Sequence, residues 1–375
     1  MEIVDINAIV GTDGLFSILG QAATTGGNMP GFIRNLWYVA AWNRELAAGA
    51  IIARTITGES LALFRRPDGT PVAFEDRCPH RMAPLSAGRL EGDSLRCMYH
   101  GLRFDCSGVC ISVPGTERVP PRLAVRSFPV AERGSWVWVW MGDPARADPA
   151  LIPQAWGLDD PDWHLKEGAL DYDADHQLIH DNLLDLSHLD YLHEKTLGAA
   201  TGGRWSDEEP AVRDVPGGVH VSRWLRNARP PYSPGPVDTH TSYHFLLPGV
   251  FLQRVRIYPL GTADRHPDGA GLPDPVFERV DQQAVTPVAP GRSRYFYAAG
   301  LAAKHGDATL AARMVDGLQE TFQQDRTMIE AQARVLAATD PRRHMTYIPM
   351  DKAPTTFRKL LAERLDIEGE ATPAS

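Results

Sequence analysis

Cysteine is scarce in this chain, with four in 375 residues. Four cysteines cannot form the dense disulfide framework of small secreted domains, and they suit a reducing cytoplasm. No apolar stretch approaches the ~18 residues that a membrane-spanning helix needs. The N-terminus begins acidic and has no basic segment, which is not typical of a secretory signal peptide. We therefore expect a cytoplasmic protein without a membrane partner.

Runs of basic residues are missing as well. Asp and Glu outnumber Lys and Arg by 47 to 38, and the net charge is −9. Because a nucleic-acid partner is usually met by a basic surface, this balance argues against one. With 43 % hydrophobic residues, the chain is long enough to bury one or two full cores.

Two of the four cysteines stand in short motifs with histidine. The first motif is Cys78-Pro79-His80, and the second, sixteen residues later, is Cys97-Met98-Tyr99-His100. Two thiolates and two imidazoles in this arrangement suit a [2Fe–2S] cluster in which the cysteines hold one iron and the histidines the other. Gly101 follows, where the lack of a Cβ lets the backbone approach the cluster. The alternative is a zinc site, although zinc knuckles usually pair Cys with Cys and His with His.

The two loops resemble the Rieske iron–sulfur motif. Rieske proteins of respiratory chains carry a further cysteine in each loop, and this chain has none at those positions. The resemblance is therefore to the soluble ferredoxin and oxygenase branch. The remaining cysteines, Cys106 and Cys110, are interpreted as structural thiols beside a turn.

A second group of metal-binding residue types lies about ninety residues further on. Residues 181–193 contain the pattern N-x2-D-x2-H-x4-H, in which the histidines are His188 and His193. Two histidines and a carboxylate that leave open positions form the facial triad of non-haem Fe(II) oxygenases. A five-residue step on an ideal helix sets the two side chains well apart in angle, so the helix must end or distort between them. Taken alone, two such histidines are more often ordinary surface or core residues.

The order of the two motifs resembles that of the Rieske non-haem iron oxygenases. This resemblance makes His188 and His193 iron ligands. It implies that Asp185 bridges a cluster-ligating histidine of one subunit to an iron-ligating histidine of the next. A carboxylate that accepts the second N–H of a metal-bound histidine is a common arrangement. The resemblance also implies that Asn182 lies near the iron, while a polar residue on a helix face is the alternative.

The third iron ligand must come from further along the chain. Residues 310–336 combine helix-forming composition with near-helical apolar spacing, which predicts a helix. Within it, residues 323–332 resemble the D-x3-[IV]-E-x-[IQ] segment of the demethylase branch, where the Asp completes the triad. The resemblance assigns that role to Asp325. The competing acids, interpreted as solvated helix charges, are Glu330, Glu320 and Asp316.

The chain is expected to contain an N-terminal extension at 1–31, disordered or additional to the folded protein, a Rieske domain at 32–145 and a catalytic domain at 146–375. Residues 36–143 read as short β-strands. Within them, Trp136, Trp138 and Trp140 alternate with period two and should share one strand face. We expect this face to pack between domains or subunits.

The catalytic domain is expected to begin with a strand at 164–174 and a helix at 175–193. Further strands are predicted at 218–226, 239–247, 250–258, 276–286 and 294–302, and a helix at 307–337 is expected to close the domain. Antiparallel strands followed by a long helix indicate an α+β fold. The resemblance implies an all-β Rieske [2Fe–2S] domain followed by a helix-grip catalytic domain, an antiparallel sheet with long helices.

The chain looks most similar to the oxygenase components of the vanillate O-demethylase and dicamba O-demethylase group. The supporting segments include residues 35–40, 78–86, 99–102 and 181–186. The resemblance implies a homotrimer and a separate ferredoxin or flavin reductase that supplies electrons from NAD(P)H. It also implies that O2 is activated at Fe(II) to oxidise an aromatic substrate. A methoxy substrate would give a hemiacetal that collapses to a phenol and formaldehyde.

The substrate pocket is less clearly indicated. By a loose alignment with the group, we expect His244, Phe251 and Gln283 to contact the substrate, although His244 is equally explained as a core histidine. An anionic substrate could also be held by arginines, and the candidates are Arg223, Arg226 and Arg229. A methoxy-aromatic acid is the expected substrate.

Three other functions remain open at this point. The first is hydroxylation of a ring, methyl or aliphatic C–H without demethylation, which product analysis would separate. The second, from another class, is an electron-transfer Rieske protein whose second domain has lost its iron. The third is a zinc-stabilised binding module, which would lack the red-brown colour of an iron–sulfur protein.

Overall fold

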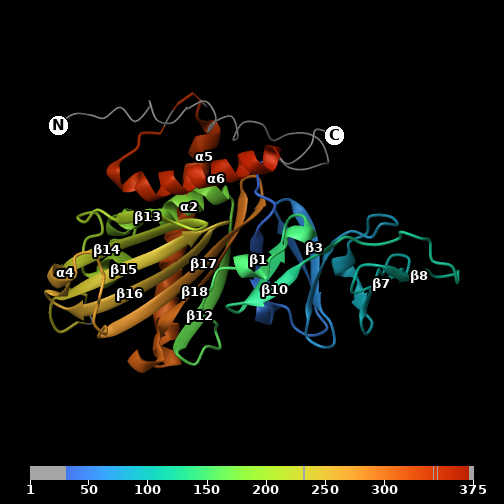
Figure 1. Ribbon diagram of the computed structural model, residues 1–375, viewed down its shortest axis with the longest axis horizontal. Helices are drawn as coiled ribbons and strands as arrows, with labels where there is room; N and C mark the ends of the chain where they lie inside the picture. Colours follow the sequence, from blue (N-terminus) through green and yellow to red (C-terminus); the bar gives the residue numbers. More distant parts are fainter. Residues whose placement is uncertain (1–30, 231–232, 341, 344, 371–375) are drawn as a thin grey trace.

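The computed structural model describes residues 31–230, 233–340, 342–343 and 345–370. Four antiparallel sheets and two long helices make up most of these residues, so the predicted α+β class is confirmed (Figure 1). The N-terminal extension expected at 1–31 lies, except for Gly31, outside the described residues. Across the described ranges, no helix is long and apolar enough to cross a membrane.

The N-terminal half, residues 31–145, contains three small sheets with the strand orders β1-β11-β10, β2-β3-β4-β9 and β5-β6-β7-β8. The predicted short strands are all present. Their bounds are β1 Trp37–Trp42, β2 Ile51–Ile56, β3 Glu59–Arg65, β4 Pro71–Glu75, β5 Arg89–Leu90, β6 Ser94–Arg96, β7 Arg103–Asp105, β8 Cys110–Ser112, β9 Ser127–Phe128, β10 Val130–Arg133 and β11 Trp136–Trp140. The sheet containing β7 and β8 forms the end of the molecule remote from the C-terminal half (Figure 1).

The C-terminal half, residues 146–370, is organised around one seven-stranded sheet of order β12-β18-β17-β16-β15-β14-β13. Six of its strands were predicted to within a few residues, and β13 was not predicted. Their bounds are β12 Trp163–Tyr172, β13 Ala211–Val215, β14 Gly218–Ala228, β15 Val237–Leu246, β16 Val250–Pro259, β17 Phe277–Ala289 and β18 Arg292–Ala302.

Most of the helices cover one face of this sheet, and the short helix Thr262–Arg265 packs against Trp224 and Tyr258 on the other face. The α-helices are α2 His176–Leu184, α3 Leu197–Thr201, α4 Thr262–Arg265, α5 Ala308–Ala338 and α6 Lys352–Glu370. The 3-10 segments are η2 Asn43–Glu45, η3 Leu85–Ala87, η4 Pro144–Arg146, η5 Pro149–Leu151, η6 Leu186–Asp190, η7 Ala303–His305 and η8 Pro349–Asp351. Helix α5 runs along the sheet and α6 lies across one end of it (Figure 1).

One helix prediction was wrong in extent, and one helix was missed. The helix expected at 175–193 ends at Leu184, because the chain leaves the α conformation at Asp185 and continues as the 3-10 turn η6. Helix α5 was expected to close the domain, but α6 follows it. Phe357 of α6 is fully buried and packs its ring 4.7 Å from that of Phe245. Long-range contacts such as this one and the ion pair of Arg358 with Asp181, rather than a strong local pattern, hold α6 in place.

A tryptophan cluster joins the two halves. Trp136, Trp138 and Trp140 share one face of β11 and are fully buried against apolar residues of β16, β17 and β18. The ring of Trp42 lies 5.3 Å from that of Trp136 and 6.4 Å from that of Phe296. Because aromatic side chains of this size bury a large apolar area, the cluster fixes one half against the other. The expected packing role of the three tryptophans is confirmed.

Candidate metal sites and substrate cavity

Two loops at the tip of the N-terminal half bring the four Cys and His candidates together. Cys78 and Cys97 are each 1 % exposed, whereas His80 and His100 lie at the surface. The imidazole rings of the two histidines are 4.6 Å apart. The pair of loops therefore offers two thiols on its inner side and two imidazoles on its outer side.

The two loops repeat one backbone conformation. The N–H of Cys78 donates to the carbonyl of Ala83, and its carbonyl accepts from Met82 N–H; Cys97 makes the same bonds to Leu102 and Gly101, all at 2.8–2.9 Å. The fourth residue after each cysteine has a positive φ, 58° at Met82 and 76° at Gly101. At Gly101 an added Cβ would also meet the Pro114 ring at 2.9 Å, so glycine is needed there for space as well.

The donor set of these loops fits a [2Fe–2S] cluster. Burial raises the pKa of the Cys78 thiol, and the neighbouring Cys97 thiol adds to this effect. Two buried thiols side by side are therefore costly to ionise unless positive charge lies between them, as cluster iron would supply. The exposed histidines suit the second iron, at the surface where a partner can approach.

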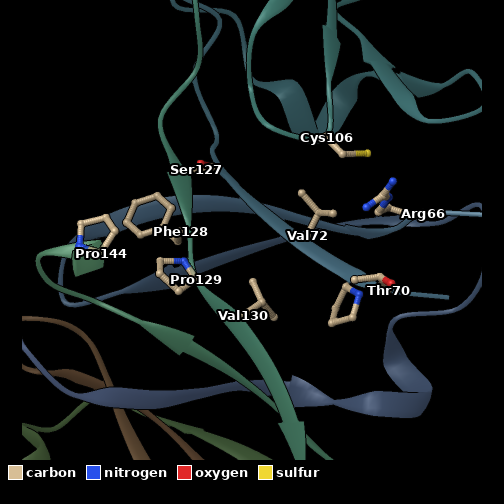
Figure 2. Close-up of a pocket in the computed structure, with 10 residues that line it drawn as sticks. Arg66, Thr70, Val72, Cys106, Ser127, Phe128, Pro129, Val130 and Pro144 are labelled. Carbon is tan, nitrogen blue, oxygen red and sulfur yellow. The ribbon is translucent and has the colours of Figure 1, made fainter. Parts of the chain in front are cut away.

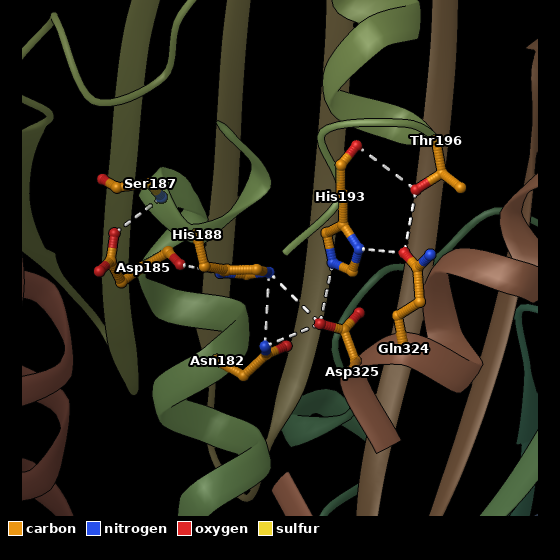
Figure 3. A network of polar contacts seen from close by, with 8 residues as sticks. All are labelled: Asn182, Asp185, Ser187, His188, His193, Thr196, Gln324 and Asp325. Carbon is orange, nitrogen blue, oxygen red and sulfur yellow. Dashed lines mark hydrogen bonds and ion pairs between the residues drawn. The ribbon is translucent and has the colours of Figure 1, made fainter. Parts of the chain in front are cut away.

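In the C-terminal half, His188, His193 and Asp325 converge on one point (Figure 3). Asp325 Oδ1 lies 2.9 Å from His193 Nε2 and 3.4 Å from His188 Nε2. The candidate ligand atoms all lie within 4.8 Å of one another. His188 belongs to η6 and His193 follows it, so the end of α2 at Leu184 lets both rings turn toward the middle of α5.

The second nitrogen of each imidazole is occupied. His188 Nδ1 lies 2.6 Å from the backbone carbonyl of Asp185, and His193 Nδ1 lies 2.8 Å from Gln324 Oε1. Since both of these partners accept, each Nδ1 carries a proton and each Nε2 faces the shared point, where its lone pair is available to a bound metal. Gln324 Oε1 also accepts from Thr196 Oγ1 at 3.0 Å. This is the arrangement of metal-bound histidines, and the residues present fit an Fe(II) ion.

The charges of the site favour an ionised carboxylate beside two imidazoles. Burial by itself raises the pKa of Asp325, but hydrogen bonds with His188 and His193 outweigh it and lower that pKa. For His193 the signs are reversed. Burial lowers its pKa, and its contact with Asp325 outweighs burial and raises that pKa. Asn182 Nδ2 donates to Asp325 Oδ1 at 3.0 Å and lies 3.4 Å from His188 Nε2, so its amide stands beside the ligands.

Asp185 has two contacts near this site. Its backbone carbonyl faces His188, while its carboxylate Oδ1 accepts from the N–H of Ser187 at 2.8 Å and caps η6 (Figure 3). The carboxylate is partly exposed at a surface groove that His188 also lines.

The competing acids of α5 lie elsewhere. Glu330 accepts from Arg326 at 2.9 Å and from the Asp173 N–H at 3.1 Å, and Asp316 pairs with Lys166. Glu320 is exposed. Sequence reasoning did not single out Gln324 or Thr196, because only the folded chain brings these residues to His193.

A buried cavity opens beside the three converging residues. Phe251 and Gln283, both predicted to contact the substrate, line it together with the three candidate ligands. Its other lining residues are Asn182, Leu183, Leu186, Leu189, Leu197, Trp205, Gln253, Arg279, Asp281, Leu318, Thr321 and Phe322. One part of the wall is therefore apolar and aromatic, and the face of β16 and β17 adds polar side chains.

The structure does not bring His244 into this cavity. His244 pairs with Leu252 across β15 and β16, on the opposite face of the sheet from Tyr243 and Phe251. Its side chain is exposed, with its ring 4.8 Å from that of His220. Successive side chains of a strand point to opposite faces of the sheet. An alignment that slips by one residue therefore assigns a surface residue to the cavity.

The three arginines considered from the sequence do not line the cavity either. Arg223 is buried but donates to the backbone carbonyl of Trp205, and Arg226 pairs with Glu208 at 2.7 Å. Arg229 is exposed. Arg279, which sequence reasoning missed, lies in the wall instead. Its position on the inner face of β17 follows only from the strand register.

Figure 2 shows a separate hollow in the N-terminal half. It lies between Arg66, Val72, Cys106, Phe128 and Pro144, and none of the candidate metal ligands lines it.

Cys106 and Cys110 form no disulfide. Cys106 donates weakly to the backbone carbonyl of Asp93, and Cys110 to that of Ser112.

Comparisons with known proteins agree with both sites. Residues 36–129 match the Rieske [2Fe–2S] domain, and residues 172–366 match the vanillate O-demethylase oxygenase C-terminal domain. The toluene-4-sulfonate monooxygenase system iron-sulfur subunit of Comamonas testosteroni is 38 % identical over 91 % of this chain and 99 % of its own length. A vanillate O-demethylase oxygenase subunit of Pseudomonas sp. is 31 % identical over 92 % and 98 %.

Among solved structures, dicamba monooxygenase with non-haem iron and dicamba is similar with a TM-score of 0.74. It is 28 % identical and covers 91 % of this chain and 99 % of its own length. The cofactors indicated by both the donor sets and these similarities are a Rieske [2Fe–2S] cluster and a mononuclear iron. The chain therefore belongs to the Rieske non-haem iron oxygenases, as the oxygenase component of a multicomponent monooxygenase with a vanillate O-demethylase-type C-terminal domain.

Proposed function

We propose that this oxygenase component removes the methyl group of a methoxy-aromatic acid and releases formaldehyde. The observation that carries the proposal is the buried cavity, which joins a two-histidine, one-carboxylate site to an aromatic wall. The similarity of residues 172–366 to the vanillate O-demethylase domain supports it. In balance, one O2, two electrons and two protons convert the aryl methyl ether to a phenol, formaldehyde and water.

The ligand assignments belong to this proposal. Cys78, His80, Cys97 and His100 hold the cluster, and His188, His193 and Asp325 hold the iron. When bound, these groups supply one-electron transfer and O2 activation. The backbone carbonyl of Asp185 and the side chain of Gln324 orient the two imidazoles, and the buried wall of the cavity excludes water. Phe251 and Phe322 are buried in the cavity wall, where they can hold an aromatic ring beside the iron ligands.

We further propose a head-to-tail homotrimer, supplied with electrons from NAD(P)H by a ferredoxin or flavin reductase. Exposed apolar side chains flank the cluster loops, namely Met82, Met98 and Tyr99. Others line the groove beside Asp185 and His188, namely Tyr191, Met328 and Tyr347. Two such surfaces on one chain can pair between copies, and Asp185 would then face a cluster-loop histidine of the neighbour. The free cysteines are consistent with a reducing cytoplasm.

Hydroxylation without demethylation is the second candidate. The observation that favours it is the 38 % identity to a protein named for toluene-4-sulfonate, a compound without a methoxy group. The same cavity would then place a ring methyl beside the iron ligands.

One experiment separates the two functions. NADH-dependent O2 uptake by the iron-loaded protein and a compatible reductase is measured on methoxybenzoates, phenolic ethers and arylsulfonates, with formaldehyde assayed in the same samples. Formaldehyde equal to the O2 consumed is the expected result. A hydroxylated product without formaldehyde would replace the proposal by the second candidate.

A further inference from the structure

The cavity wall contains one positively charged side chain among its described residues, that of Arg279. Two carboxylates also line the cavity, Asp325 and Asp281. Asp325 faces His188 and His193. The charges remaining for a substrate are therefore those of Arg279 and Asp281.

Arg279 and Asp281 form a loose pair on β17. They are two residues apart, so their side chains share one face of the strand. Arg279 Nη2 lies 3.6 Å from Asp281 Oδ2, which is longer than a hydrogen bond. Within the described part of the chain, the Arg279 side chain makes no hydrogen bond, although a guanidinium has five N–H donors. Asp281 thus balances the charge of Arg279 but leaves the N–H donors of the guanidinium free.

The surroundings of this pair are polar and incompletely satisfied. Asp281 is 3 % exposed, and burial raises the pKa of its carboxyl while Arg279 acts in the opposite direction. In the buried wall, Asp281 Oδ2, Gln283 Oε1 and Thr321 Oγ1 have no hydrogen-bond partner among the described residues. Because unpaired buried polar atoms are unfavourable, this part of the cavity suits water or polar groups that are not part of the chain.

The pair lies at a distance from the iron ligands. Phe322, three residues before Asp325 on α5, packs its ring 4.5 Å from that of Tyr297 and 5.7 Å from that of Tyr295. Arg279 of β17 pairs with Leu301, which lies four and six residues further along β18 than these two tyrosines. A ligand held by Arg279 would therefore direct its opposite end toward His188, His193 and Asp325.

We propose that Arg279 anchors the acid group of the substrate, a carboxylate or a sulfonate, and that Asp281 is a positioning residue for the guanidinium. This inference rests on the proposed function, since it assumes that the substrate occupies this cavity. A guanidinium presents parallel N–H donors that match the planar carboxylate and two oxygens of a sulfonate. The reacting methoxy or methyl group lies across the ring from the acid, in the meta or para position.

The competing arrangement uses the same residues differently. A neutral substrate could donate an O–H or N–H to Asp281, and Arg279 would then serve only to balance the charge of Asp281. The two arrangements predict opposite preferences between an acid and its amide, so affinities for a matched set of ligands separate them.

The test measures binding of 4-methoxybenzoate, 4-methoxybenzenesulfonate and 4-methoxybenzamide to the holoprotein by anaerobic calorimetry. We expect both anions to bind more tightly than the amide. Arg279→Met should lower the affinity for both anions by about 10- to 100-fold, the size of a lost charge-assisted hydrogen-bonded pair. The affinity for the amide should change by no more than about threefold. Arg279→Lys should restore part of the affinity. Arg292→Met, the same change at an exposed arginine at the start of β18, is the control and should have no effect.

Two results would overturn the inference. One is an amide that binds the wild-type protein as tightly as the acids; loss of that binding in Asp281→Asn would then assign it to Asp281. The other is an equal loss of all three ligands in Arg279→Met. The wild-type comparison decides the matter even if a variant does not fold. If the protein prefers the anions but releases no formaldehyde, the role of Arg279 stands and demethylation is removed. If acid and amide give formaldehyde equally well, demethylation stands and the role of Arg279 is removed.

Discussion

The cluster loops and the iron site bring metal-binding side chains together in different ways. In the N-terminal half, all four candidate ligands lie between residues 78 and 100, on two loops that repeat one set of backbone hydrogen bonds. In the C-terminal half, the three candidate ligands lie between residues 188 and 325, on a 3-10 turn, the segment after it and the middle of a 31-residue helix. The first site depends on local turns, and the second depends on the packing of α2 and α5 on the large sheet.

The two sites also differ in exposure. His80 and His100 are at the surface, whereas His193 is 1 % exposed and Asp325 is buried. An exposed site suits electron exchange with a partner, and a buried one suits O2 chemistry that must exclude water. The comparison therefore predicts that each metal can be removed without the other, and that disturbing the large sheet affects the iron first.

The largest effect is expected for Asp325→Ala. This change removes the only carboxylate of the three converging residues, so mononuclear iron should be lost and turnover should fall below detection. Iron analysis together with the visible spectrum of the cluster measures both sites in one sample.

Cys78→Ser is the reciprocal control, because it should remove the cluster spectrum and leave one iron per chain. If Asp325→Ala retained its mononuclear iron, another acid such as Glu330 would have to be the ligand.

Asp185→Asn is expected to slow turnover by roughly 10- to 100-fold, because its carboxylate is proposed to accept from a cluster-loop histidine of the neighbouring subunit and the loss of such a partner of a metal-bound histidine has an effect of this size. Asn can still accept from the Ser187 N–H and leaves the backbone carbonyl beside His188, so both metals should stay bound. Steady-state O2 uptake with unchanged iron and cluster content measures this effect. Wild-type turnover in the variant would remove the proposed inter-subunit role of the carboxylate, as would a strictly monomeric active enzyme in light scattering.

Gln324→Leu should lower the affinity for iron by about 10- to 100-fold, because His193 would lose the acceptor that fixes its tautomer. Gln323→Leu is the matched control, since Gln323 is its exposed neighbour on α5. Competition with a chelator ranks the two variants, and the cluster spectrum should be the same in both. Equal iron retention would show that Gln324 does not support the ligand.

The smallest effect concerns acid stability. Burial lowers the pKa of His220 and of His240 to about 4, with Arg213 and Arg256 respectively adding to the shift. Between pH 6.5 and 4 the unfolded chain therefore binds more protons than the fold, so stability should decrease as the pH falls through this window, by roughly 1–3 kcal/mol for each histidine. The N-terminal half contains only the exposed His80 and His100.

Thermal unfolding at pH 7.5 and pH 5 tests this difference between the halves. Iron release should move to lower temperature at pH 5 before the cluster absorbance changes. His240→Gln should reduce the pH dependence of the iron transition. A simultaneous shift of both signals, unaffected by this variant, would mean that the two halves unfold as one unit.

The cluster loops could be predicted from the sequence more fully than the helices of the C-terminal half, for a physical reason. A motif such as Cys78 to His100 encodes its own geometry, because short loops have few conformations and glycine marks one of them. The spacing of His188 and His193 predicted a break between these two residues, but α2 already ends at Leu184, before both of them. Helix α6 was missed because its burial depends on Phe357 meeting Phe245 of β15, a contact that no local pattern indicates.

The cavity shows the limit most clearly. Phe251 and Gln283 were expected to reach the substrate and do line the cavity, but His244 lies on the outer face of the sheet and Arg279 was not considered. In a strand, one residue of register decides between the two faces, and a single sequence does not specify register that finely.

By itself, the sequence determined the two sets of candidate metal ligands, their order and the α+β class, because residue type and short spacing carry that chemistry. Only the tertiary structure decided which second contacts orient His188 and His193, and which charges face the cavity. Those properties depend on side chains that are distant in the chain and meet only when the sheet, α2 and α5 pack together.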